Sequence, residues 1–285
     1  MKLIVNFTPT GMIPTKEMTP HVPVSPSEVV EQVHEVWEMG ITMVHLHARD
    51  EKGVPTYKAG IYEEMITGIR KFSKDLILCV SLSGRTFKEF EKRSEPLTLE
   101  GDAKPDMGSL TLSSVNFNKQ ASMNEPSMIQ ALAAEMKKRN IVAELEAFDA
   151  GMINYAKYLE YKKLLEGPHY FNLLLGNIAC AQADLLHAGM MVRDLPPNSI
   201  WSFAGIGNTQ LMMNSLAIAS GGGVRVGLED NIWFDTKRTR LATNAELVKR
   251  IHGLAEANQR EIMPAKEARE LLNLEPGNGS YGRKY

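Results

Sequence analysis

Eight short, apolar, β-rich runs recur along this chain of 285 residues, and most of the segments between them have the residue pattern of helices. The runs are Leu3–Phe7, Thr42–His47, Leu76–Leu82, Ser109–Ser114, Ile141–Phe148, Phe171–Gly176, Ile200–Gly205 and Val224–Glu229. Strands that alternate with helices form parallel sheets with right-handed crossovers. Eight such units favour a closed barrel over an open, doubly wound sheet, so we predict a (β/α)₈ TIM barrel of the α/β class.

Capping residues and turn-forming residues mark the ends of the helices. Ser25 or Ser27 can cap a helix over Glu28–Met39, which a glycine then ends. The further helices that we expect are Pro126–Lys138, Asn154–Glu166, Asn208–Ser220 and roughly 243–258. The segment Thr86–Met107 is polar and contains proline, and it is the weakest of the helix predictions.

The length and the composition fit a single domain. The chain is 44% hydrophobic and 23% charged, which is ordinary for a globular protein, and no linker rich in proline, glycine or serine divides it. We therefore expect one domain over residues 1–285. Its last part, residues 264–285, should hold a short helix at Pro264–Leu274 and then a loosely held tail, EPGNGSYGRKY.

The net charge of -2 gives no indication of binding to nucleic acid or to an anionic membrane. No stretch approaches the ~18–20 apolar residues of a membrane-spanning helix, and the apolar run at the N-terminus is too short for a signal peptide. Cys79 and Cys180 both lie in apolar stretches, so we expect two reduced, buried thiols. These features predict a soluble, cytoplasmic protein.

Two histidines end the second predicted strand, in the segment HLHARD. Residues two apart on a strand face the same side, so His45 and His47 should both point into the barrel. A barrel carries its chemistry at the carboxyl ends of its strands, and neutral imidazole is a good ligand for zinc. The alternative is a hydrogen-bonded, purely structural pair, but this pattern at a strand end favours a divalent metal.

The eighth predicted strand offers a third ligand, because the segment VRVGLED ends with Glu229 and Asp230. In a closed barrel only the first strand separates the eighth from the second, so Glu229 can reach the metal held by His45 and His47. The alternative is that both acidic residues belong to a solvated loop or cap a helix. The position at a strand end, near the histidine pair, favours the metal.

Three further charged residues should face the barrel interior. Arg225 lies on the inward face of the eighth strand, and a buried arginine is costly unless it is paired. Asp230 is its natural partner if the chain bends after the strand. Glu144 and Glu146 share one face of the fifth strand. They either contact substrate or do acid–base work, with Glu144 as a catalytic candidate and Glu146 as a substrate contact, or they pair with an inward arginine or lysine; both interpretations stay open.

Polar or glycine-containing turns follow three other predicted strands. Hydroxyls and backbone N–H groups in such turns can receive a carboxylate or a phosphate. Barrels also often bind phosphate in the loops after the seventh and eighth strands. The candidates are Ser81, Ser83, Gly84 and Thr111 for an anionic substrate, and Gly205 and Gly207 for a phosphate-bearing cofactor.

Several segments, taken in chain order, resemble the β-keto acid cleavage enzymes. They are NFTPTG, HLHARD, SLSG, ELEAFDAGM, FNLLLGN, WSFAGIG and GGGVRVGLEDN, and the resemblance runs from about Lys2 to Leu274. It implies a metal-dependent (β/α)₈ barrel, usually a homotetramer. Such an enzyme condenses a β-keto acid with acetyl-CoA, as co-substrate, to give acetoacetate and a new acyl-CoA.

The resemblance also implies roles for individual residues. His45, His47 and Glu229 match the zinc ligands, and Asp230 with Arg225 matches the pair that removes a proton from the keto acid. The resulting enolate would attack the thioester, and a retro-Claisen step would release acetoacetate. The residues that match substrate contacts are Ser81, Gly84, Thr111 and Glu144.

Two departures from the family concern the substrate. Members that act on an amino-substituted keto acid have a glutamate in the loop after the first strand, but here Pro14 stands near that place and Glu17 is only a loose candidate. Arg85 follows the SLSG turn, where those members are richer in glycine. Both changes disfavour an amino substrate, and Arg85 suits an anionic or polar tail.

Three other functions compete with this one. Amidohydrolase-type hydrolases carry HxH on the first strand and histidines at the ends of strands five and six, whereas His169 precedes the sixth predicted strand here and His187 lies in a helix. A metal-dependent lyase or aldolase that cleaves a C–C bond without CoA stays open. A scaffold barrel without catalysis has no need of buried charges at its strand ends.

Overall fold

The computed structural model describes residues 1–284, and the eight expected strands form one closed, parallel barrel. These strands are β1 Val5–Phe7, β2 Met43–Leu46, β5 Ile77–Val80, β6 Met107–Thr111, β9 Val142–Ala147, β10 His169–Leu175, β11 Ser199–Gly205 and β12 Gly223–Val226. Around the barrel their order is β1-β12-β11-β10-β9-β6-β5-β2, and β1 pairs with both β12 and β2. The prediction of a (β/α)₈ barrel is confirmed.

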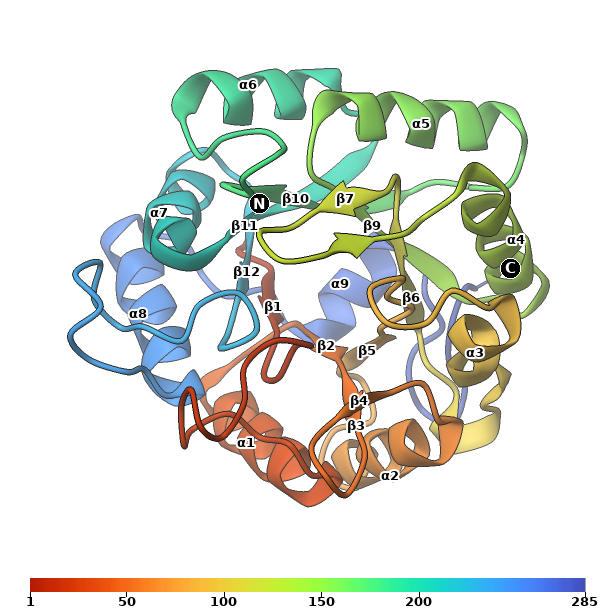
Figure 1. The fold of residues 1–285 in the computed structure, drawn as a ribbon, viewed down its shortest axis with the longest axis horizontal. Coiled ribbons are helices and arrows are strands. Elements are labelled where there is room, and N and C mark those ends of the chain that lie inside the picture. Colours follow the sequence, from red (N-terminus) through yellow and green to blue (C-terminus); the bar gives the residue numbers. More distant parts are fainter. Residues whose placement is uncertain (285) are drawn as a thin grey trace.

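Helices form a ring outside the barrel (Figure 1). They are α1 Pro26–Met39, α2 Ala59–Arg70, α3 Phe90–Ser94, α4 Pro126–Lys138, α5 Ala150–Tyr161, α6 Leu185–Asp194, α7 Gln210–Ala219 and α8 Asn244–Ala257, whereas α9 Ala265–Leu271 is not part of this ring. In the segment 86–107, where the helix prediction was weakest, the structure has the short helix α3 and the 3₁₀ turns η1 Glu95–Thr98 and η2 Gly101–Ala103. Two small hairpins, β3 Ala48–Arg49 with β4 Pro55–Thr56 and β7 Val115–Asn116 with β8 Ala121–Ser122, extend from the ends of β2 and β6.

Side-chain caps decide where two of the helices begin. Ser25, one of the two expected cap residues, caps α1 and forms a capping box with Glu28. The helix expected from residue 154 instead begins at Ala150, because the Asp149 carboxylate accepts a hydrogen bond of 3.0 Å from the Met152 N–H. The prediction over 154–166 was therefore placed about one helical turn too late.

The inward-facing positions change from apolar to polar along the strands. Near their amino ends, a buried cluster joins the strands to the segment that contains α9; its members include Ile4, just before β1, and Met43, Ile77, Met107, Val142 and Ile200 of the strands. Closer to the carboxyl ends, the buried inward side chains include Asn6, His45, Ser109, Glu144, Tyr170, Ser202 and Arg225. The barrel thus has an apolar floor and a polar opposite end, where functional side chains can gather.

The C-terminal segment closes the amino end of the barrel, and α9 is seen through the centre of the ring in Figure 1. Arg269 of α9 donates hydrogen bonds of 2.9 and 2.8 Å to the two oxygens of Asp106. The Gly282 N–H donates to the same carboxylate, at 3.2 Å, and Tyr281 is buried. The expectation of a loosely held tail is wrong for its described residues, because the chain's own barrel binds them.

Two further expectations concern membranes and thiols. Within residues 1–284, the structure has no helix with the length and apolarity needed to cross a membrane. Both cysteines are free; Cys79 is buried, but Cys180 is partly exposed, which corrects the expectation of two buried thiols. The organisation as one domain over 1–285 stays a prediction, and Tyr285 lies outside the described residues.

We expect the substitution Asp106→Asn to lower the free energy of unfolding by about 3–5 kcal/mol, because Arg269 would keep a buried charge without a full counter-charge. Urea titration followed by circular dichroism measures this change. The control is Glu261→Gln, which removes a long, exposed ion pair with Lys2 and should leave stability unchanged. Equal midpoints for the two variants would contradict this account of the barrel floor.

Candidate functional site

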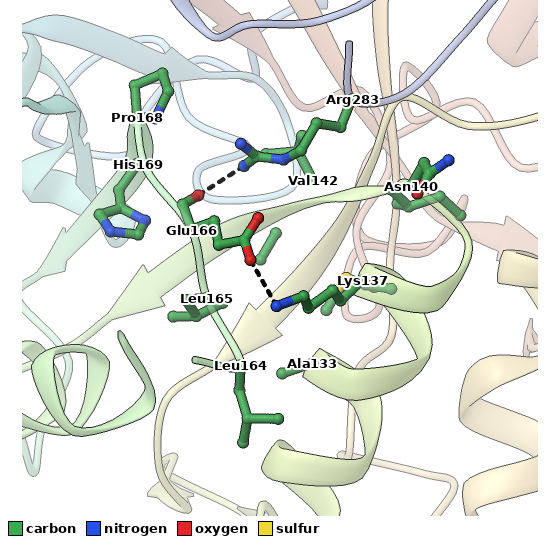
Figure 2. Close-up of a pocket in the computed structure, with 13 residues that line it drawn as sticks. Ala133, Lys137, Asn140, Val142, Leu164, Leu165, Glu166, Pro168, His169 and Arg283 are labelled. Carbon is green, nitrogen blue, oxygen red and sulfur yellow. Dashed lines mark hydrogen bonds and ion pairs between the residues drawn. The ribbon is translucent and has the colours of Figure 1, made fainter. Parts of the chain in front are cut away.

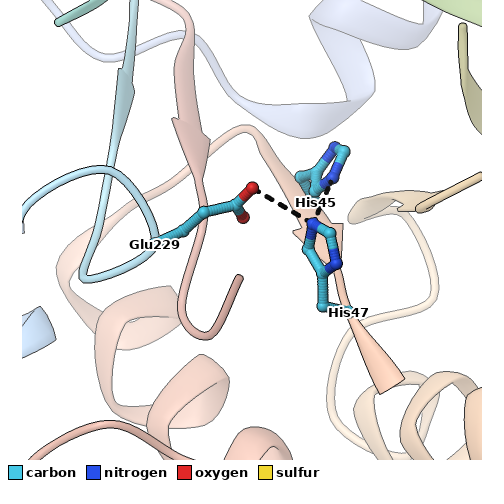
Figure 3. Close-up of side chains that lie close together, drawn as sticks. All are labelled: His45, His47 and Glu229. Atoms are coloured by element: carbon cyan, nitrogen blue, oxygen red, sulfur yellow. Dashed lines mark hydrogen bonds and ion pairs between the residues drawn. The ribbon is translucent and has the colours of Figure 1, made fainter. Parts of the chain in front are cut away.

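Two histidines and one glutamate lie together at the carboxyl end of the barrel (Figure 3). His45 in β2 and His47 just after it have their Nε2 atoms 3.2 Å apart. Glu229, in the loop after β12, has its Oε1 atom 3.1 Å from His47 Nε2. One potential ligand atom from each residue lies within 4.8 Å of the other two. The structure thus brings together the three residues that the sequence analysis assigned to a metal.

A sharp bend after β12 brings Glu229 back over the barrel. Gly227 has a φ of +155°, and a Cβ at this position would collide with the backbone carbonyl of Thr8, at the end of β1. On the other side, Gly11 has a φ of +67°, and a Cβ there would lie 2.9 Å from the Cβ of Glu229. Glycine is therefore required where the two loops approach each other most closely.

The hydrogen bonding of the cluster fits a divalent cation. His45 Nδ1 lies 2.5 Å from Glu144 Oε2, so an Nδ1–H donating to this carboxylate leaves the Nε2 lone pair directed at His47. Glu229 Oε2 is buried and has no hydrogen-bond partner among residues 1–284. A cation between these atoms would satisfy all of them, and a carboxylate behind a ligating histidine is usual in metal sites. Two imidazoles and one carboxylate suit zinc.

A second group, His45, Cys79 and Glu144, also has its potential ligand atoms within 4.8 Å of one another. It is fully buried, and the Cys79 thiol donates to Glu144 Oε2 at 3.1 Å. Burial raises the pKa of this thiol well above its usual value, and the Glu144 charge raises it further. Because the thiolate and not the thiol binds metals, this group is the weaker candidate.

Arg225, on the inward face of β12, is buried among three carboxylates. Its Nε donates to Asp230 Oδ2 at 3.0 Å, Nη1 to Glu146 Oε1 at 3.2 Å and Nη2 to Glu229 Oε1 at 2.6 Å. The pairing with Asp230 that the sequence suggested is present, with two additional partners. Of the two interpretations offered for Glu146, the structure shows the pairing with an inward arginine.

Burial and neighbouring charges set the protonation of these groups. Burial raises the pKa of Asp230 to about 6, although Arg225 opposes the shift. Burial acts in the same direction on Glu229, but the charges of His47 and Arg225 prevail and hold its pKa well below the usual value. Burial favours the neutral form of His45, but Glu144 and Glu229 outweigh it and raise the pKa of this ring to about 9, so a metal ion that binds Nε2 would displace a proton from it. Glu229 is therefore the more firmly ionised of the two carboxylates after β12.

The expected substrate contacts lie beside this cluster. Thr111, at the end of β6, donates from Oγ1 to Glu146 Oε2 at 2.7 Å, so it joins the group around Arg225. The Ser81 N–H donates to the carbonyl of Leu46, which places Ser81 beside the strand that carries both histidines. These two residues, from neighbouring strands, stand at the same end of the barrel as the metal candidates.

The turn after β5 is held against the hairpin formed by β7 and β8. Ser83 Oγ accepts a hydrogen bond of 3.3 Å from the Arg85 N–H. The Gly84 carbonyl accepts one of 3.2 Å from the Met123 N–H, and a Cβ on Gly84 would collide with the Met123 carbonyl. Ser83 and Gly84 therefore shape the turn, whichever group the turn receives.

The glycine turn after β11 contacts the loop that carries Asp230. The Gly207 N–H donates to the Asp230 carbonyl at 2.8 Å, and a Cβ on Gly205 would collide with the backbone of Thr209. The Gly207 N–H is thus used within the fold and is not open to a phosphate in this structure. Arg238 lies beside this turn and donates from Nε to Asn208 Oδ1 at 2.7 Å.

The sequence analysis missed the polar residues that surround Glu144 inside the barrel. Asn6 Nδ2 donates to Glu144 Oε1 at 2.7 Å, and the hydroxyls of Tyr170 and Ser202 lie 2.7 Å apart. Each of these residues is buried at an inward position of its strand. The period-two rule that was applied to β2, β9 and β12 could have identified them in β1, β10 and β11.

A separate surface pocket lies near the amino ends of β9 and β10 (Figure 2). Its charged side chains already have partners: Lys137 Nζ lies 2.5 Å from Glu166 Oε1, and Arg283 donates to the backbone carbonyl of Glu166 at 2.6 Å. This pocket is at the opposite end of the barrel from His45 and His47, and its paired charges offer no free group for catalysis.

Comparison with known proteins agrees with these features. Residues 2–274 match the family model for beta-keto acid cleavage enzymes. The chain is 36% identical over 274 residues to 3-oxoadipate:acetyl-CoA acetyltransferase of Cupriavidus necator, covering 95% of this chain and 94% of that protein. It is 33% identical over 275 residues to 3-keto-5-aminohexanoate cleavage enzyme of Fusobacterium nucleatum, covering 96% and 98% of the two proteins.

Solved structures show the same fold. The apo structure of ObcA superposes with a TM-score of 0.77 at 20% sequence identity, and the match covers 89% of this chain but only 65% of the ObcA chain. At this identity the likeness concerns the barrel fold alone. The match to the family model over nearly the whole length, together with the two curated relatives, shows that this chain belongs to the β-keto acid cleavage enzyme family.

Proposed function

We propose that this protein is a zinc-dependent acyltransferase that condenses a β-keto acid with acetyl-CoA and releases acetoacetate and a new acyl-CoA. The observation that carries the proposal is the cluster of His45, His47 and Glu229 beside the pair formed by Arg225 and Asp230. The names of several relatives support it, because they combine acetyl-CoA with 3-oxoadipate, 3-dehydrocarnitine or 3,5-dioxohexanoate, each of which carries a 3-oxo group.

In this proposal His45, His47 and Glu229 hold the metal, with zinc as the first choice. When bound, such an ion would supply Lewis-acid stabilisation of the negative charge that develops on the 3-oxo group of the keto acid. Glu144 accepts from His45 Nδ1 on the side away from His47, so it acts as a positioning residue that sets the orientation of the ring. The sequence had suggested Glu144 as a group close to the substrate.

Asp230 is the proposed general base. It removes a proton from C2 of the keto acid, and Arg225 holds its carboxylate in place. The C2 carbanion attacks the acetyl carbonyl of acetyl-CoA and expels the CoA thiolate. The thiolate then attacks the original C3 carbonyl, the C2–C3 bond breaks, and its electron pair leaves on the acetoacetate carbanion. That carbanion takes a proton back, so atoms and charges balance.

The substrates would bind at the carboxyl end of the barrel, where the proposed metal ligands and base lie. Ser81, Gly84 and Thr111 are the proposed contacts of the keto acid carboxylate. Because the Gly207 N–H is already bonded, the cationic side chain of Arg238 beside that turn is the better candidate for the CoA phosphates. The homotetramer and the cytoplasmic location stay predictions.

Two of the rival functions can be separated from this proposal. His169 begins β10, at the amino end of the barrel, and His187 lies in α6, so the histidines that an amidohydrolase places at strand ends are not at the site. A lyase that does not use CoA would need the same metal and base. It would break down the keto acid at the same rate with and without acetyl-CoA.

We expect one zinc ion to bind per chain, and we expect His45→Ala to abolish binding because one of three ligands is lost. Glu144→Gln should weaken binding by about 10- to 100-fold, since the partner of His45 Nδ1 changes. Metal analysis of zinc-loaded, dialysed protein and competition with a chelator measure both effects. The control is His34→Ala, which changes an exposed histidine of α1 and should bind zinc as the wild type does. A wild-type protein with no affinity for zinc or another divalent ion would overturn the metal assignment.

The substitution Asp230→Asn should leave metal content unchanged and lower kcat by about 10²- to 10⁴-fold, because the amide cannot accept the C2 proton. Acyl-CoA formation from acetyl-CoA and a β-keto acid measures the rate. Asp194→Asn, at the partly exposed end of α6, serves as the matched control and should keep full activity. Near-normal turnover of Asp230→Asn would show that another group is the base.

A further inference from the structure

Arg85 follows the turn after β5 and lies at the edge of the candidate site. Its guanidinium carbon lies 3.9 Å from the centre of the Phe117 ring, in the segment between β7 and β8. Burial lowers the pKa of Arg85, and the negative charges of Glu229, Glu146 and Asp230 oppose this shift. Arg85 directly follows the turn that contains Ser81 and Gly84, the proposed contacts of the keto acid carboxylate, so a cation stands next to the proposed substrate contacts.

The backbone of Arg85 is held in place by the fold. Arg93 donates from Nε to the Leu82 carbonyl at 2.8 Å and from Nη1 to the Met123 carbonyl at 3.2 Å, so it fastens the turn to the adjacent hairpin. The bonds from the Met123 N–H to the Gly84 carbonyl and from the Arg85 N–H to Ser83 Oγ complete the clamp. The side chain thus starts from a fixed position.

The guanidinium of Arg85 differs from those of Arg225 and Arg93 in making no hydrogen bond to the described part of the chain. Arg225 contacts three carboxylates, and Arg93 contacts two carbonyls and the side chain of Asn124. Within residues 1–284, by contrast, no side chain or carbonyl forms a hydrogen bond or ion pair with the Arg85 guanidinium. A partly buried guanidinium with five unused donors is well suited to bind an anion in two-point contact.

The group that Arg85 would bind is neither the C1 carboxylate nor the 3-oxo group, both of which every β-keto acid has. In the proposed function a bound metal would act on the 3-oxo group and the turn that contains Ser81 would contact the C1 carboxylate, so Arg85 is left for the variable end of the molecule. Glu17, the loose candidate for binding a substrate amine, is exposed, and Pro14 is buried. The loop after β1 therefore does not favour a substrate with an amino-substituted tail. Arg49 donates to the Pro14 carbonyl at 2.8 Å and keeps this part of the loop in place.

Resting on the proposed function, we propose that Arg85 determines specificity by binding a second, terminal carboxylate, so the preferred substrates are β-keto dicarboxylic acids. The positive charge attracts this group and repels a terminal ammonium. The stacking of the guanidinium on Phe117 keeps its edge available for two hydrogen bonds.

The test compares three β-keto acids of equal chain length that end in a carboxylate, a carboxamide or an ammonium group. Wild-type kcat/KM should be about 10- to 100-fold higher for the carboxylate than for the carboxamide, as expected for a hydrogen-bonded charge pair, and lowest for the ammonium. Arg85→Gln should remove this preference by raising KM for the dicarboxylic acid and leave kcat/KM for the carboxamide unchanged. Arg85→Lys should restore part of the preference. Arg193→Gln, on the exposed end of α6, should behave like wild type.

Several outcomes would overturn the inference while leaving the proposed function intact. Equal losses of kcat/KM for all three keto acids in Arg85→Gln would show that Arg85 binds a shared group. A rise in KM for acetyl-CoA alone would assign Arg85 to CoA. Turnover of all three by the wild type without preference for the carboxylate would show that Arg85 does not select the tail. If the wild type turned over none of them, the proposed function itself would fail, and this inference with it.

Discussion

The Arg225 guanidinium donates to Glu146 on β9 and to Glu229 and Asp230 in the loop after β12. Three carboxylates brought this close would repel one another, and each would be costly to bury alone. The shared cation removes this obstacle, and its planar donors fix where each carboxylate lies. Arg225 thereby holds Glu229 against His47 and keeps Asp230 close to Glu229. The candidate metal ligand Glu229 and the proposed base Asp230 therefore both depend on one buried charge.

The remainder of the barrel supports this arrangement. Apolar inward residues and the C-terminal segment close the amino end, and polar inward residues begin one layer further along the strands. In that layer Glu144 binds His45 and is itself held by Asn6 and Cys79. A chain of hydrogen bonds thus runs from the strand interior to the imidazole ring. The site therefore stands on strands and short fixed turns, which makes its geometry largely preorganised.

The sequence was sufficient to predict the barrel, because alternation of eight strands and helices has few topological solutions. Period two also identified His45, His47 and Arg225 as inward residues. It did not show which inward side chains meet, since that depends on the stagger between strands; Glu144 proved to bind His45, and Glu146 to bind Arg225. The C-terminal tail was misjudged because its anchor, Asp106, lies far away in the chain.

The central claim is that the acetyl group of acetyl-CoA becomes part of acetoacetate. The most direct measurement uses acetyl-CoA labelled with ¹³C at both acetyl carbons, an unlabelled β-keto acid and NMR analysis of the products. The account predicts that C3 and C4 of acetoacetate carry the label, that C1 and C2 are unlabelled, and that the new acyl-CoA contains no ¹³C. Label that stays in acetyl-CoA, or appears only in acetate while the keto acid is cleaved, would contradict it.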